Sequence, residues 1–425
     1  MKTENNARKN INVHYVAILM FFSNICLANT ITVDTAGNDS NPGTTALPVA
    51  TLQKAIELAE SDDVIEIKPG RYESTGGIKI DHKENITISG VIDNGGNIPE
   101  FMLMGGYVNG VEFGEETRNI VLENISLTWM SNEDGNVLAI AGSDITVRNN
   151  KLSFDQNSLA TKYDGIKILA TAKNILIQSN EISKAPQQCI DAVGGIGIVV
   201  RGNKLQNCDS GIVLKGGTSG NLIEFNFIRN MTHSGIGLGG TTLPEYSQAE
   251  YEISSTTARE NIITYDDPNN IGGGIFLRGA ENCTVENNSI YGPGIYIQAG
   301  GDPAKLNYKS ANNVIKSNIV WRTGNDGILV VDAGNDLGLT LESNCYWKTT
   351  GSGEFKINGT WLSYASYLSD IKFDSESVFE DPAFLNPQDG DFIVPPTSPC
   401  FTKGADQSKF TKLDAAIPAP TLRIE

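Results

Sequence analysis

One motif recurs along the chain: Val147-Arg-Asn-Asn150, Ile177-Gln-Ser-Asn180, Val200-Arg-Gly-Asn203 and Ile223-Glu-Phe-Asn226. In each copy a β-rich tripeptide is followed by an asparagine. The series continues at Asn261, Asn288, Asn318 and Asn344. Successive asparagines are 30, 23, 23, 35, 27, 30 and 26 residues apart. The shortest spacing fits one coil of three short strands and three turns, and the longer ones fit that coil with an inserted loop.

A second strand in each repeat opens with a small residue and an aliphatic one. The copies are Asp164-Gly-Ile-Lys-Ile168, Cys189-Ile-Asp-Ala192, Ser210-Gly-Ile-Val-Leu214, Ser234-Gly-Ile-Gly-Leu238, Gly274-Ile-Phe-Leu277, Pro293-Gly-Ile-Tyr-Ile297 and Asp326-Gly-Ile-Leu-Val330. Apolar residues alternate, so one set points inward and the other outward. Stacked coils would place each strand about 4.8 Å from its next copy. Because no helical pattern separates the strands, the sequence predicts an all-β fold, a single-stranded right-handed parallel β-helix.

The two ends of the repeat array look like caps. Residues Thr51–Ala59 have helical spacing and predict an N-terminal capping helix over the open end of the stack. Past Asn344 the repeat weakens, which predicts an irregular C-terminal cap. We therefore expect one domain over 29–425, with coils at about 64–373 and a closing segment at about 374–425.

The first residues predict export. Lys2, Arg8 and Lys9 precede the apolar run 15–22, and small residues follow at 26–28. This order is typical of a signal peptide, here 1–28, and the run is too short to span a bilayer. We therefore expect a secreted or periplasmic protein with no membrane partner.

The charge of the chain restricts its partners. A cut after Ala28 removes three basic residues and one acidic residue, which changes the net charge from −18 to −20. Such an acidic body would repel nucleic acid, and it would bind an acidic polysaccharide only through a local cationic cluster. We expect an acidic polysaccharide as the substrate, no nucleic-acid partner and a monomer.

Five cysteines remain after this cut: Cys189, Cys208, Cys283, Cys345 and Cys400. An odd number without a Cys-x-x-Cys pair predicts neither a disulfide framework nor a zinc site. We interpret each as a small buried residue in the repeat.

Several segments resemble the secreted pectate-lyase-like β-helix superfamily. They are Thr32–Gly43, Thr51–Ile56, Ile67–Tyr72 and the closing motif from Asp381-Pro to Ser398-Pro. The resemblance implies the fold but not the reaction, because this fold hosts lyases, hydrolases, epimerases and phage adhesins.

Two narrower resemblances concern the reaction. Lys215-Gly-Gly-Thr-Ser-Gly-Asn221 is similar to the lysine-bearing coil of the chondroitinase B and alginate lyase family, which implies that Lys215 is the base. That family's arginine would fall at Gly239. The segments Tyr163–Ile166 and Cys189–Ala192 resemble polygalacturonases, but the aspartate pair of those hydrolases is replaced here by Gln187-Gln188. The substitution disfavours that hydrolase chemistry.

The alternation predicts two outward rows on one face. The first row is Lys167, Asp191, Val213, Gly237, Phe276, Tyr296 and Leu329, and the second is Leu169, Val193, Lys215, Gly239, Arg278, Gln298 and Val331. Lys215 and Arg278 would lie two coils apart, roughly 9.6 Å. Glycines 237 and 239 would leave an indentation between them.

These residue types fit β-elimination from a uronate sugar. Lys215 would remove the C5 proton, Arg278 would neutralise the carboxylate, and His233 or Tyr296 would protonate the leaving oxygen. Asp191 and Asp209 could hold Ca²⁺, and we expect no organic cofactor.

Further side chains are expected to contact the substrate. Lys167 and Gln298 lie in the predicted rows. Tyr246 and Tyr251 lie in an insertion at 241–252 that would overhang the groove and stack on sugar rings. A second insertion, 300–309, would form another wall.

We therefore predict an extracellular polysaccharide lyase that cleaves a uronate-containing polymer. The alternatives are a glycoside hydrolase or a C5-epimerase on the same fold, and a non-catalytic carbohydrate-binding surface protein. Each charged residue taken alone could also be an ordinary solvated side chain.

Overall fold

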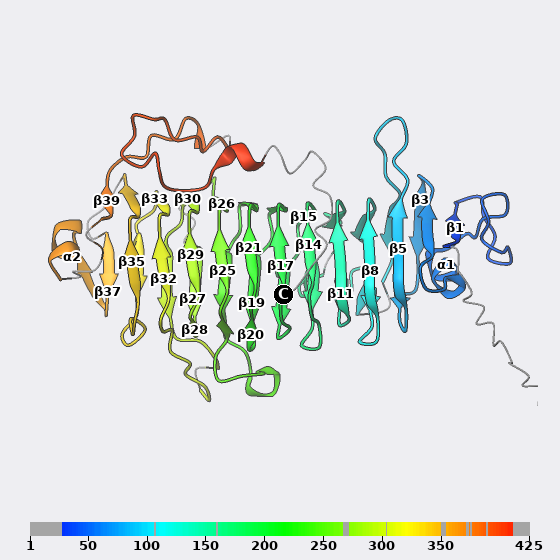
Figure 1. Ribbon diagram of the computed structural model, residues 1–425, viewed down its shortest axis with the longest axis horizontal. Coiled ribbons are helices and arrows are strands. Elements are labelled where there is room, and N and C mark those ends of the chain that lie inside the picture. Colours follow the sequence, from blue (N-terminus) through cyan, green and yellow to red (C-terminus); the bar gives the residue numbers. More distant parts are fainter. Residues whose placement is uncertain are drawn as a thin grey trace, which may run out of the picture.

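The chain forms a rod of stacked coils (Figure 1). The computed structural model describes residues 28–410, apart from 106–107, 159, 267–271, 303, 350–353, 371–373, 375 and 388–389. All of the predicted signal peptide except Ala28 lies outside the described residues. No helix in the described part is long and apolar enough to cross a membrane.

Three long sheets form the sides of the rod, and each described sheet has 12 strands. Sheet 1 contains β1 (Thr30–Val33), β2 (Val64–Ile67), β5 (Glu84–Gly90), β8 (Arg118–Glu123), β11 (Ser143–Arg148), β14 (Leu176–Gln178), β17 (Val199–Arg201), β21 (Leu222–Glu224), β25 (Thr257–Arg259), β29 (Thr284–Glu286), β32 (Val314–Lys316) and β35 (Thr340–Glu342). Sheet 2 contains β4 (Ile78–Ile80), β7 (Asn109–Phe113), β10 (Asn136–Ile140), β13 (Ile166–Ile168), β16 (Gln188–Val193), β19 (Ser210–Lys215), β23 (Ser234–Gly239), β27 (Gly273–Arg278), β31 (Ile295–Gln298), β34 (Leu329–Val331), β37 (Phe355–Ile357) and β38 (Thr360–Leu362). Sheet 3 contains β3 (Arg71–Ser74), β6 (Glu100–Leu103), β9 (Ser126–Trp129), β12 (Lys151–Phe154), β15 (Glu181–Ser183), β18 (Lys204–Gln206), β22 (Phe227–Arg229), β26 (Ile262–Thr264), β30 (Ser289–Gly292), β33 (Ile319–Arg322), β36 (Cys345–Lys348) and β39 (Val378–Phe379). A small fourth sheet joins β20 (Thr218–Ser219), β24 (Ile253–Ser254) and β28 (Ala280–Glu281).

The repeated asparagines form a buried, hydrogen-bonded ladder between sheets 1 and 3. At a typical rung, the backbone N–H of Asn180 donates to Oδ1 of Asn203 over 2.9 Å. Nδ2 of Asn180 donates to the same oxygen over 3.0 Å and to the backbone oxygen of Val147 over 2.9 Å. The rungs continue without a break from Asn150 to Asn344. Each corner therefore satisfies its own polar groups inside the rod.

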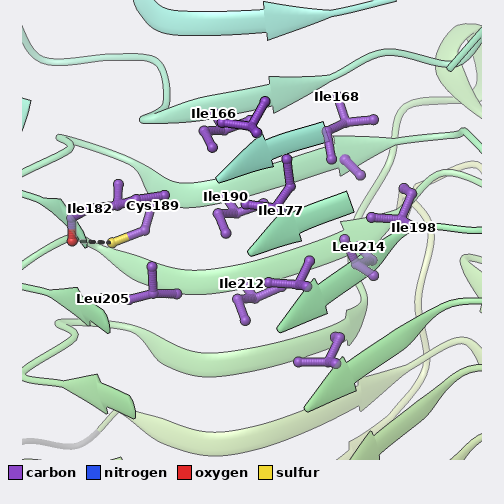
Figure 2. Packing of buried hydrophobic residues seen from close by; sticks show 14 of the residues in the cluster. Ile166, Ile168, Ile177, Ile182, Cys189, Ile190, Ile198, Leu205, Ile212 and Leu214 are labelled. Carbon is purple, nitrogen blue, oxygen red and sulfur yellow. Dashed lines mark hydrogen bonds between the residues drawn. The ribbon is translucent and has the colours of Figure 1, made fainter. Parts of the chain in front are cut away.

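Aliphatic side chains fill the inside of the coils in columns. Ile166, Ile190 and Ile212 are paired in register on sheet 2, and Figure 2 shows them one above another. All three are fully buried. Full burial of such a side chain contributes about 1.5–3 kcal/mol, so the column repeats a favourable contact at every coil.

Helix α1 (Leu52–Leu58) covers the N-terminal end of the rod, which confirms the predicted capping helix. The Thr51 hydroxyl accepts from the backbone N–H of Lys54 over 3.1 Å, as expected for an N-cap. The buried side chains of Leu52, Ala55 and Ile56 close the core there.

At the other end, β37 and β38 pair antiparallel and α2 (Tyr364–Asp370) follows. The Tyr367 ring stacks on Phe355, with ring centroids 4.0 Å apart. Beyond β39 the chain does not plug the end as the predicted cap would. Its described residues, 380–387 and 390–410, run back along sheet 3 as an irregular strap that includes the short helix η3 (Gln407–Lys409) (Figure 1).

The strap packs on outward-facing apolar side chains of sheet 3. Phe384, Phe392 and Cys400 form one buried cluster with Ile262 and Ile319. This contact explains why the closing segment lacks the repeat: it covers a side of the rod and does not add a coil.

The five cysteines are buried, as predicted, but the prediction that they form no disulfides was wrong. Cys189 is bonded to Cys208 and Cys345 to Cys400, each pair with a Cα–Cα distance of 5.7 Å. Only Cys283 among the described cysteines is unpaired, and burial raises its pKa to about 12. The first disulfide joins neighbouring coils, and the second fastens the strap to β36.

Candidate functional site

A groove of about 260 Å³ lies on the outer face of sheet 2, at β16, β19, β23 and β27. Lys215 ends β19, Arg278 ends β27, and His233 lies directly before β23. All three line the groove. The side chains that complete the lining are mostly small or polar: Gln188, Asp209, Ser210, Val213, Ser234, Gly237, Gly239, Gly240, Thr241 and Phe276.

Glycines form the floor of the groove, as the sequence predicted. Gly239 lies between Lys215 and Arg278 in the second outward row, because β19, β23 and β27 are paired in register. Its φ is +91°, and a Cβ at this position would lie 1.9 Å from the backbone oxygen of Arg278. Only glycine fits there, so the floor stays at backbone level.

The predicted rows hold up to β31 and fail at β34. Tyr296 pairs with Val330, not with Leu329. Leu329 and Val331 are fully buried, so both belong to the inner face. The motif Asp326-Gly-Ile imitates the earlier strand openings but lies one residue out of step, and a slip of one residue exchanges the two faces of a strand.

Arg278 is held in place from two sides. Its guanidinium lies over the Phe276 ring, 4.1 Å from the centroid, and its Nε donates to Oε1 of Gln298 over 3.0 Å. Nε2 of Gln298 donates in turn to Asp332 over 3.2 Å. Burial lowers the pKa of Arg278, although a guanidinium remains charged at neutral pH. Gln298, predicted to bind substrate, does not line the groove and instead orients Arg278.

An aromatic stack supports the groove wall opposite Lys215. The exposed His233 ring lies parallel to Phe276 at 5.7 Å, and Phe276 stacks on Tyr296 at 4.8 Å. The Tyr296 hydroxyl donates to Asp326 over 2.7 Å, and burial raises its pKa. Tyr296 therefore lies behind the groove wall, and of the two proposed proton donors only His233 faces the groove.

A chain of buried charges extends from Lys215 away from the groove. Nζ of Lys215 lies 3.2 Å from Oδ1 of Asp191, whose other oxygen is paired with Lys167. Lys167 also lies 3.4 Å from Asp164. Both aspartates are only 1% exposed. Lys167, predicted to bind substrate, forms ion pairs with these two carboxylates and does not line the groove.

Burial and the neighbouring charges shift the pKa values of Asp164 and Lys167. Desolvation and the neighbouring Asp191 raise the pKa of Asp164 to about 7, against the opposing effect of Lys167. Desolvation alone would lower the pKa of Lys167, but Asp191 and Asp164 outweigh it and raise that pKa. The sequence interpretation missed Asp164 as a site residue. The available signal was the lysine three residues after it, Lys167, in strand β13.

The two aspartates predicted to hold Ca²⁺ do not fit that ion. Asp191 faces two ammonium groups. Asp209 accepts hydrogen bonds from Thr232 over 2.7 Å and from Ser210 over 3.3 Å. Within the described ranges, no group of three or more His, Cys, Asp or Glu side chains is placed to hold a metal ion. Calcium usually takes six to eight oxygen ligands, which this pair cannot supply.

The two insertions lie on the same long side of the rod, beside β20 and β28 (Figure 1). They touch each other, since Oγ of Ser247 lies 3.3 Å from the Tyr308 hydroxyl oxygen. Neither Tyr246, in the short helix η1 (Pro244–Tyr246), nor Tyr251 lines the groove. Thr241 is the one residue of this insertion that lines the groove, so the two tyrosines predicted to stack on sugar rings lie beyond the groove edge.

Comparisons with known proteins agree with this architecture. A family described as the right-handed β-helix region matches residues 197–367, and one described as periplasmic copper-binding protein (NosD) matches residues 27–238. An uncharacterized Bacillus subtilis (strain 168) protein, YwoF, is 25% identical over 443 residues, which cover 85% of this chain and 90% of that protein. His233 is the one histidine among the groove-lining residues, and no cysteine lines the groove, so the groove does not fit the copper in the NosD description.

Two solved structures illustrate the likeness. A GH136 lacto-N-biosidase from Eubacterium ramulus has a TM-score of 0.54 at 10% identity, over 83% of this chain and 67% of that one. The pectate lyase Pel9A has a TM-score of 0.46 at 12% identity, over 88% of this chain and 91% of that one. At 10% identity, the likeness to the lacto-N-biosidase shows a shared fold alone, and the reaction has to be argued from the residues of the groove.

Proposed function

We propose that this right-handed parallel β-helix, which resembles the pectate-lyase-like proteins, is an exported lyase that cleaves a uronate-containing polysaccharide by β-elimination. The observation that carries the proposal is the lining of one groove by Lys215, Arg278 and His233. The periplasmic family that matches 27–238 supports a location outside the cytoplasm.

The three side chains supply the groups that this reaction needs. Lys215, in its neutral form, takes the C5 proton of the uronate, and the electrons of that bond form the C4–C5 double bond. The C4–O bond then breaks, and protonated His233 gives a proton to the departing oxygen. Arg278 binds the carboxylate and stabilises the negative charge that develops next to C5.

Support around the groove fixes two of these groups. Gln298 and Phe276 hold the Arg278 guanidinium from its edge and its face. Oδ1 of Asp191 lies 3.2 Å from Nζ of Lys215, where it positions the amine and stabilises the ammonium that forms when Lys215 takes the proton. Positioning of this kind lets the groove bind the transition state without first reorganising.

The charges that line the groove also explain how an acidic protein could bind an anionic polysaccharide. The chain carries a net charge of −18, but the lining has two cations, Lys215 and Arg278, and one carboxylate, Asp209, and the neighbouring Asp191 is also paired with Lys167. At physiological ionic strength charges farther away than about 8–10 Å are largely screened, so a bound uronate would sense mainly this cationic lining.

The test is a panel of uronate and neutral polysaccharides incubated with the purified protein. Lyase action creates an unsaturated uronate that absorbs in the ultraviolet, and Lys215→Ala should abolish that absorbance. Lys204→Ala is the matched control, because Lys204 is an exposed lysine on sheet 3. Equal cleavage by wild type and Lys215→Ala would refute the assignment of the base.

One observation favours glycoside hydrolysis as a second candidate. Asp164 and Asp191 are neighbouring buried carboxyls, and the pKa of Asp164 is raised to about 7. Such a pair can divide into an acid and a base. In that case new reducing ends would appear without ultraviolet absorbance, and Asp164→Asn would remove more activity than Lys215→Ala.

A further inference from the structure

The outward row that forms the groove floor continues along sheet 2 toward the C-terminal end of the rod. Strand pairing places Phe276 next to Tyr296, Tyr296 next to Val330, and Val330 next to Lys356. Phe276, Tyr296 and Val330 form one apolar cluster, and each is at most 8% exposed. Beyond the groove this row therefore consists of packed apolar side chains, and it ends at a lysine.

An exposed tryptophan stands at the end of this row. Trp361 pairs with Lys356 across the β37–β38 hairpin and is 46% exposed. The Lys356 ammonium lies 5.8 Å from the centre of the indole ring. A Cβ added to Gly327 would lie 3.4 Å from the ring, so the indole leans back over the coil of β34. Within the described part of the chain, Lys356 forms no ion pair with an acidic side chain.

We propose that Lys356 and Trp361 form a second binding subsite for the same anionic polysaccharide. One sugar ring would stack on the indole, and its carboxylate would pair with the Lys356 ammonium. This inference rests on the proposed function, because it takes the occupant to be a polymer that extends from the groove.

The spacing along the rod fits one continuous occupant. Strand β27, which carries Arg278, and strand β37, which carries Lys356, are three coils apart, roughly 14.4 Å. A polymer lying parallel to the rod axis would pass from the Arg278 guanidinium over Phe276 and Tyr296 to Trp361. The two cationic points would then bind carboxylates of different sugar units on one chain.

Asp326, the carboxylate that contacts Tyr296, is occupied by protein groups. Asp326 accepts from the Tyr296 hydroxyl over 2.7 Å and from its own Gly327 N–H over 2.8 Å. Its backbone oxygen accepts from Lys348 over 3.1 Å. These contacts reduce the repulsion that Asp326 would otherwise exert on an anionic sugar at Trp361.

The experiment compares Trp361→Ala and Lys356→Gln with wild type on a long uronate polymer and on the shortest oligosaccharide that wild type cleaves. We expect the KM for the polymer to rise roughly fivefold more than the KM for the short oligosaccharide, because stacking of one ring contributes about 1 kcal/mol. Phe401→Ala is the matched control, since Phe401 is 51% exposed on the strap and should leave both values alone.

Direct calorimetric binding of the polymer to each variant separates the two proposals. If wild type binds and cleaves the polymer but both variants change the two KM values equally, the subsite is refuted and the lyase proposal stands. If wild type binds the polymer without cleaving it and Trp361→Ala weakens that binding about fivefold, the subsite stands and the lyase proposal fails. If wild type binds no uronate polymer, both are refuted.

Discussion

The asparagine ladder should be a large and localised source of stability, and Asn226 tests it. Its side chain is fully buried. Oδ1 accepts from the backbone N–H of Asn203 over 2.9 Å, and Nδ2 donates to the backbone oxygen of Val200 and to Oδ1 of Asn261, each over 2.9 Å. Alanine at this position would remove all of these contacts at once.

The expected loss follows from the groups left behind. Asn261 Oδ1 keeps a donor, the backbone N–H of Asn226. The backbone N–H of Asn203 and the carbonyl of Val200 both lose their ladder partner inside the rod. A buried polar group that loses its partner costs about 1–3 kcal/mol, so Asn226→Ala should lower the free energy of unfolding by about 2–5 kcal/mol.

Urea unfolding followed by circular dichroism measures this loss. Asn325→Ala is the control, because Asn325 is exposed, forms no side-chain hydrogen bond with the described residues and should change stability by less than about 0.5 kcal/mol. Equal unfolding midpoints for the two variants would refute the view that the ladder stabilises the corner of the coils.

Three further predictions concern single features of the fold. The stability of wild type relative to Asp164→Asn should fall as pH rises from about 4 to about 7. In that window the carboxyl of the unfolded chain has released its proton, whereas the buried carboxyl, with its pKa raised to about 7, has not. A stability difference between the two proteins that does not change with pH, measured by thermal unfolding, would contradict the assigned pKa. Replacing Cys189 and Cys208 together by alanine should lower the free energy of unfolding by roughly 3 kcal/mol, because the disulfide closes a loop with a sequence separation of 19. Urea unfolding measures this loss, and a value below about 1 kcal/mol would contradict a stabilising disulfide. Gly239→Ala should destabilise the protein by about 1–3 kcal/mol more than Gly220→Ala, because both have positive φ but a Cβ meets backbone only at Gly239; equal effects would argue against the close approach.

Much of the fold could be predicted because the positions of the repeated residues determine how the strands of successive coils align. The spacing of Asn150 through Asn344 is the length of each coil, and the small-plus-aliphatic motif marks where each strand of sheet 2 begins. That register placed Lys215, Gly239 and Arg278 correctly in one row. It failed at Leu329, where a strand opening looks like the others but starts one residue out of step.

The features that could not be predicted are contacts between side chains that lie far apart in the sequence and meet only when the coils stack. The paired cysteines are far apart in sequence, and nothing local shows that Cys345 meets the strap. The ion pairs of Asp191 with Lys167 and Lys215 arise because neighbouring strands bring the three side chains together. The same contacts remove Asp191 from a calcium site and Lys167 from the groove.

The fate of the hydrogen at C5 tests the central claim most directly. A uronate polymer deuterated at C5 is incubated with wild type, and the products are analysed by mass spectrometry. Abstraction by Lys215 predicts slower cleavage than of the unlabelled polymer and an unsaturated product that has lost the deuterium. Cleavage at an unchanged rate, with the deuterium retained in saturated products, would contradict β-elimination in this groove.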